Sequence, residues 1–164
     1  MTDAQGAIDA LVGAHSPLAD PAVERFYARY RGDALVIDKW FSIQATAPEQ
    51  DGRVFERAQA LLTHPDFSLL NPNRVRSLVG AFCMGNPAAF HRVDGAGYRF
   101  WADRVLELDG ANPQLAARMA RVMDRWTKLA EPYRGEARQA LERVAARAGL
   151  STDVREIVSH ALEA

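Results

Sequence analysis

Apolar residues recur every three or four positions along nearly the whole 164-residue chain, and this spacing constrains the fold more than any other feature. Proline and glycine interrupt the pattern, so that most segments are three or four helical turns long. The segment from Val36 to Gln44 begins with two β-branched residues, but it is too long and too clearly spaced at 3.6 residues to be a strand. The chain is therefore predicted to be all-α.

The dipeptide Asn-Pro occurs three times, at positions 71–72, 86–87 and 112–113. Asparagine is a good N-cap, and proline suits the first helical position, where its missing N–H is not needed. Helices are therefore expected to begin after each pair, the last of them running to about Trp126. Asp33 is expected to cap another helix, and Gly110 to end the one that begins near Tyr98.

Short connections between such helices make neighbours antiparallel. A run of antiparallel helix pairs, each with one broad apolar face, stacks as an α-solenoid of the HEAT or armadillo type. A compact helical bundle is the alternative. The first segment has the apolar residues Ile8, Leu11 and Val12, and no obvious polar cap precedes it. A solenoid, by contrast, normally begins with a repeat that has a polar outer face.

The composition excludes several classes of protein. A formal net charge of −1 gives no sign of a nucleic-acid partner, which calls for a clustered positive field. No apolar run approaches the roughly 20 residues needed to cross a bilayer, and the first residues do not resemble a signal peptide, so no membrane partner is expected. Cys83, the one cysteine, is expected to be a buried thiol in a reducing compartment, which favours the cytoplasm.

Several longer motifs occur in a fixed order. They are VIDKWFSIQATAP from Val36, NPNRVRSLVGAF from Asn71, NPAAFH from Asn86, DGAGYRF from Asp94 and NPQLAARMARVMDRW from Asn112. Together they closely resemble the C-terminal domain of bacterial aminopeptidase N, the alanyl aminopeptidase type of zinc metallopeptidase in the gluzincin family. The resemblance covers nearly the whole chain. It implies that residues 1–164 are a single helical-repeat domain, that Met1 is internal to a longer polypeptide, and that the catalytic domain lies outside this sequence.

The residues that such an enzyme needs for catalysis are missing. Zinc in this class is held by the pattern H-E-x-x-H and a third ligand downstream. The four histidines are scattered and none precedes a glutamate: His15, His64, His91 and His160. Glu156 and His160 are one helical turn apart, which is typical of a surface pair. The chain alone is therefore predicted to be non-catalytic and to bind no metal, while the resemblance implies zinc in the full-length enzyme.

Arginine is the remaining candidate for a functional side chain. A solvated polar face is expected for Arg121 and Arg125, and Arg74 is expected to pair with a neighbouring carboxylate. The resemblance singles out Arg76 and Arg118 as substrate-binding residues that face an enclosed cavity and hold the distal part of a peptide. A guanidinium suits this role because its fork of donors matches a carboxylate.

The aromatic residues recur at helical spacing and are predicted to be core. His91 is expected to bond the backbone at a helix end. The resemblance implies a domain that caps the active-site cavity of an aminopeptidase, restricts access to it, and has the peptide substrate and its own catalytic domain as partners. The alternative is a stand-alone helical-repeat scaffold that binds another protein through its concave face.

Overall fold

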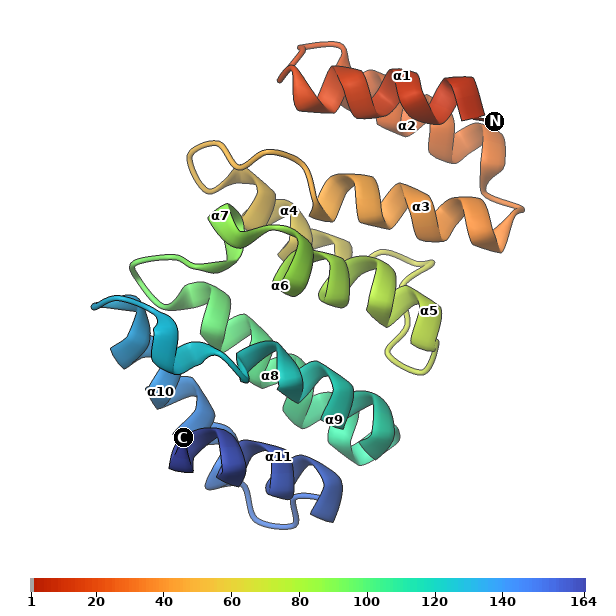
Figure 1. Ribbon diagram of the computed structural model, residues 1–164. Coiled ribbons are helices and arrows are strands. Elements are labelled where there is room, and N and C mark those ends of the chain that lie inside the picture. Colours follow the sequence, from red (N-terminus) through yellow and green to blue (C-terminus); the bar gives the residue numbers. More distant parts are fainter. Residues whose placement is uncertain (1) are drawn as a thin grey trace. The chain divides into compact units, whose positions relative to one another are not determined.

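The computed structural model describes residues 2–164, and every regular element within that range is a helix. The all-α prediction is confirmed. The helices pack as antiparallel pairs, as in armadillo-type repeats, so the predicted α-solenoid class is confirmed as well (Figure 1). The chain divides into two compact units, Met1–Ala89 and Phe90–Ala164.

The first unit is built around α3 (Ala34–Ala45), which contacts helices on several sides. Asp33 caps α3 as predicted, since its carboxylate accepts hydrogen bonds from the N–H groups of Leu35 and Val36. The Trp40 indole donates to the carbonyl of Val23 at 3.0 Å and so ties α3 to α2. The other elements of this unit are α1 (Thr2–Gly13), α2 (Ala19–Tyr30), α4 (Arg53–Leu61), α5 (Pro72–Val75), η1 (Arg76–Gly80) and α6 (Ala81–Gly85).

The helix that begins at Pro72 is not uniform. Asn71 caps it as predicted, but a π-helical turn, η1, separates α5 from α6. A π-turn widens the helix and disturbs the regular hydrogen-bond ladder. Two serines contact the backbone there: Ser42 of α3 donates to the carbonyl of Ser77 at 3.0 Å, and Ser77 donates to that of Arg74 at 3.1 Å. The spacing of apolar residues in this segment did not indicate the π-turn.

The second unit is built around α8 (Ala96–Ala111), which packs against α9 and α10. The Trp101 indole on α8 donates to the carbonyl of Met119 at 2.8 Å, and the Trp126 indole donates to that of Ala161 at 2.7 Å. The residues of α7 (Pro87–Phe90) belong to the first unit except for Phe90, which begins the second. The remaining elements of the second unit are α9 (Pro113–Ala120), η2 (Arg121–Met123), η3 (Trp126–Lys128), α10 (Tyr133–Ala145) and α11 (Thr152–Glu163).

Two predicted helix ends in this unit are wrong. Gly110 does not stop α8, which continues to Ala111; an isolated glycine is tolerated inside a helix at a cost of about 1 kcal/mol. The helix that follows Asn112 does not continue to Trp126. It ends at Ala120, and two tighter 3₁₀ turns follow. Trp126 lies in the second of these turns, where its ring is buried and its indole reaches α11.

The start of α8 is sterically constrained. Gly95 has φ +69°, a conformation that favours glycine. A Cβ added to Gly97 would lie 1.9 Å from the carbonyl oxygen of Phe90, so only glycine fits there without a backbone shift.

The predicted hydrogen bond from His91 to the backbone is wrong, because the Nδ1 of His91 lies 2.8 Å from the Tyr98 hydroxyl. Burial lowers the pKa of His91 and raises that of Tyr98 to about 12.

Most of the aromatic residues predicted to form the core are buried, and so is the thiol of Cys83. Tyr27 and Tyr30 are partly exposed. The Tyr27 hydroxyl donates to the Asp66 carboxylate at 2.7 Å, which raises the pKa of Tyr27.

Candidate functional site

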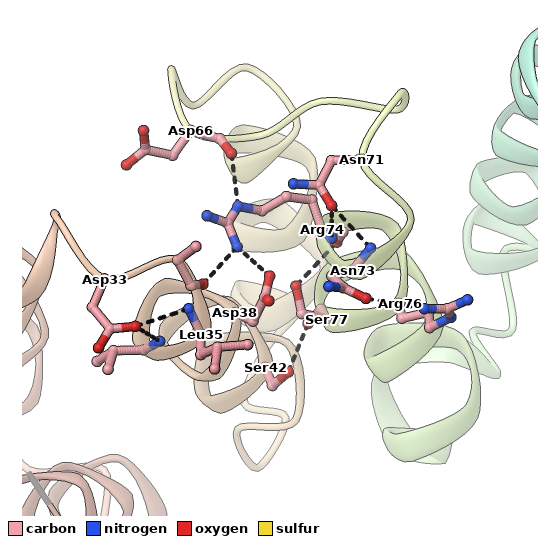
Figure 2. Close-up of polar contacts among 12 residues, drawn as sticks. Asp33, Leu35, Asp38, Ser42, Asp66, Asn71, Asn73, Arg74, Arg76 and Ser77 are labelled. Carbon is pink, nitrogen blue, oxygen red and sulfur yellow. Dashed lines mark hydrogen bonds and ion pairs between the residues drawn. The ribbon is translucent and has the colours of Figure 1, made fainter.

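Arg74 is buried, although it stands only two residues from Arg76. Its side chain is 8% exposed and forms an ion pair with Asp38 of α3. The guanidinium also donates to the carbonyl of Ala34 at 3.0 Å and to that of Asp66 at 2.9 Å (Figure 2). The predicted pairing with a carboxylate is confirmed. Arg74 therefore joins α3, the loop before α5 and α5 itself, and its donors are used within the fold.

Arg76 lies at the first position of η1 and is exposed. Its Nη1 donates to the side-chain oxygen of Asn73 at 3.0 Å. In Figure 2 its guanidinium points away from that of Arg74. Its side chain forms no ion pair with a carboxylate of residues 2–164. Most of its donors therefore remain available to a ligand.

Sequence reasoning missed the role of Asn73. The spacing could have revealed it, because Asn73 and Arg76 are three residues apart and share a helix face. An amide oxygen at this distance holds the guanidinium on the exposed side of the helix without neutralising its charge.

Arg118 is exposed on α9, and its side chain makes no ion pair or hydrogen bond with any of residues 2–164. It borders a groove of about 540 Å³ between α9 and α11, termed here the α9–α11 groove. The groove is lined by Gln114, Ala117, Arg118, Arg121, Asp124, Asp153, Glu156, Ile157 and His160. Arg118 is thus a cation at the edge of a concave surface.

The other arginines of this region are exposed, as predicted. Arg121 lies 3.6 Å from the Asp124 carboxylate, whereas Arg125 is solvent-exposed and does not line the groove. Glu156 and His160 are both exposed, which confirms the predicted surface position of this pair. Both line the α9–α11 groove, which the sequence did not indicate.

The two candidate arginines belong to different units, Arg76 to the first and Arg118 to the second. Within residues 2–164, no three or more His, Cys, Asp and Glu side chains are grouped in a way that could hold a metal ion. Over the same residues, no helix is both long enough and apolar enough to cross a membrane.

The protein family described as a domain of unknown function with ARM repeats, DUF3458_C, matches residues 1–163. The chain belongs to this family. It is 40% identical over 162 residues to aminopeptidase N of Escherichia coli strain K12 and 42% identical over 163 residues to that of Caulobacter vibrioides. These alignments cover 99% of this chain and 18% of each relative.

A solved structure shows the same likeness. The crystal structure of Legionella pneumophila aminopeptidase A in complex with aspartic acid matches with a TM-score of 0.91 and 36% identity, over 99% of this chain and 19% of that one. The chain thus spans about a fifth of the length of the relatives that it matches. The predicted resemblance to the C-terminal domain of aminopeptidase N is confirmed.

Proposed function

We propose that this DUF3458_C chain is the C-terminal helical domain of a longer zinc-dependent aminopeptidase, which releases N-terminal amino acids from peptides. This proposal is supported by the 40–42% sequence identity to aminopeptidase N relatives over 99% of the chain. The same similarity favours this function over a stand-alone protein-binding scaffold. Zinc and the groups that break the peptide bond belong to the catalytic domain, outside residues 1–164, which form one helical-repeat domain of the enzyme.

The domain's proposed role is to cap the active-site cavity, restrict access to it and contact the distal part of the peptide through Arg76 and Arg118. Arg76 and Arg118 differ from the nearby Arg74 in the partners of their guanidinium groups. The guanidinium of Arg74 donates to Asp38 and to two backbone carbonyls. Arg76 and Arg118 are exposed, and neither forms an ion pair with a carboxylate of residues 2–164. A guanidinium in a cavity that is partly shut off from water binds a carboxylate more strongly than at an open surface.

The partners that follow from this role are a peptide substrate and the protein's own catalytic domain. A nucleic-acid or membrane partner is not part of the proposal, because the formal net charge is −1 and Arg76 and Arg118 are assigned to peptide. The place of action is proposed to be the cytoplasm, where a single reduced cysteine such as Cys83 is stable.

The role of the arginines is tested in the full-length enzyme with Arg76→Ala and Arg118→Ala. Each variant should raise KM for peptides several-fold and leave a single-residue alanyl amide unaffected, because the amide does not extend to the distal site. Arg125→Ala is the matched control, since this arginine is exposed and lies outside the α9–α11 groove. Equal losses on peptide and amide substrates would contradict a distal contact.

The non-catalytic nature of the domain is tested separately. The purified 164-residue chain should not hydrolyse an alanyl amide, with or without added zinc. Hydrolysis by the pure chain that a chelator blocks would overturn this part of the proposal.

A further inference from the structure

The α9–α11 groove carries charges of both signs on its two walls. The α9 wall presents Arg118, and the α11 wall presents Asp153 and Glu156. Asp153 and Glu156 are three residues apart on one helix and therefore share a face. Both are exposed, and neither side chain forms an ion pair or hydrogen bond within residues 2–164. Arg118 forms no ion pair with either of them, so the groove presents a cation and two carboxylates that are not in direct contact.

The remaining lining groups leave this charge separation intact. Arg121 and Asp124 also line the groove, and they lie 3.6 Å apart, so together they add no net charge to it. His160 lies one turn beyond Glu156 on the same wall. Ile157, which is partly exposed, supplies apolar surface to the lining, whereas Ala117 is largely buried. A ligand that suits this groove needs an anion for one wall, a cation for the other, and aliphatic carbon between them.

The carboxyl-terminal residue of a peptide has this arrangement when it is lysine or arginine. Its terminal carboxylate and its cationic head are separated by an aliphatic stem of three or four methylenes. α9 and α11 pack against each other, and packed helices have axes about 8–10 Å apart, so the two walls are neighbouring surfaces. An uncharged last residue would supply only the carboxylate and leave the two acidic groups facing water.

We propose that the α9–α11 groove selects peptides that end in lysine or arginine, with the terminal carboxylate on Arg118 and the basic side chain on Asp153 and Glu156. This inference rests on the proposed peptide contact of Arg118 and adds the class of substrate. The carboxylate pair sets the preference, while Arg118 contributes to every peptide with a free carboxyl terminus.

The full-length enzyme tests the preference with peptides of three to eight residues that are identical except for a last residue of lysine or methionine. Methionine resembles lysine in length without its charge. At the length that reaches the groove, the lysine peptide should show a KM lower by about two- to five-fold, as for an exposed ion pair. The difference should shrink at high salt. Equal KM values at every length would overturn the inference.

Two variants separate the preference for a basic last residue from the peptide contact of Arg118 on which it rests. Glu156→Gln should reduce the lysine preference, while Glu163→Gln, a matched exposed carboxylate on α11 outside the groove, should keep it. Arg118→Ala should raise KM for both peptides. If Arg118→Ala acts on both but Glu156→Gln changes nothing, the peptide contact stands and the basic preference is wrong. If Arg118→Ala changes neither peptide, the contact itself is wrong and the inference falls with it.

Discussion

The two helices that carry the candidate arginines begin alike and are held in place differently. Each starts with Asn-Pro, and in each the asparagine side chain accepts backbone N–H bonds. The third residue after the asparagine is buried in both, but it is Arg74 in the first unit and Leu115 in the second. An arginine there requires Asp38 and two carbonyls as partners, whereas a leucine requires only apolar neighbours.

The partner helices reflect this difference. Polar contacts join α3 to α5 and η1, namely the Arg74–Asp38 ion pair and the bond from Ser42 to the Ser77 carbonyl. The second pair, α8 and α9, has the indole bond from Trp101 to Met119 within an apolar interface. The first interface therefore adds an ion pair and a serine bond to its buried apolar residues, next to the π-turn that carries Arg76. The second is apolar apart from the indole bond, and Arg118 lies on a regular helix.

Replacing Arg74 by the leucine of the second unit should produce the largest effect. Arg74→Leu leaves Asp38 without its partner in a site where the carboxylate is only 18% exposed. We expect a loss of roughly 3 kcal/mol in the free energy of unfolding, measured by denaturant titration. Arg118→Ala is the control and should stay within about 0.5 kcal/mol, because its side chain is exposed.

A double variant separates the ion pair from the other bonds of Arg74. Adding Asp38→Leu to Arg74→Leu should recover part of the loss, because an apolar pair can replace a buried ion pair. No recovery would indicate that the bonds to the carbonyls of Ala34 and Asp66 matter more than the ion pair.

In the second unit, the largest effect should come from steric crowding. Gly97→Ala places a methyl group against the Phe90 carbonyl, and we expect a loss of about 2 kcal/mol or more in thermal or denaturant unfolding. Gly110→Ala in the same helix has open space around it and should stabilise by about 0.5–1 kcal/mol. A neutral Gly97→Ala would mean that the start of α8 can shift.

The serine at the π-turn should have a smaller effect. Ser42→Ala removes the donor to the Ser77 carbonyl, and we expect a loss of about 1 kcal/mol. In the full-length enzyme, this change should also affect Arg76-dependent peptide binding if the π-turn sets the position of Arg76. Ser159→Ala, on the exposed face of α11, is the control.

The smallest effect concerns pH and His91. Burial lowers the pKa of His91 in the folded state below its unfolded value of about 6.5. The unfolded chain therefore binds more protons in the window below that value, and stability should fall as the pH drops from 7 toward 5. His91→Gln should show a shallower decline over this window in denaturant midpoints. Identical slopes for the two proteins would contradict the assignment to His91.

Much of the fold follows from local chemistry. The caps at Asp33, Asn71 and Asn112 were predictable because each depends on one side chain and the N–H groups next to it in sequence. The buried aromatic rings were predictable from their spacing. The site was predictable only in part: the resemblance pointed to Arg76 and Arg118, and both proved exposed, but their contact with peptide is still a prediction.

The amino-acid pattern alone is enough to predict that this chain is helical, where most of its helices begin and which faces they bury, because these properties depend on neighbours within one or two turns. Three features became visible only in the folded chain: Arg74 is buried, a π-turn follows it, and Glu156 shares a groove with Arg118. Each of these depends on groups about 35 to 40 residues apart in the chain, and local spacing carries no information about contacts at that separation.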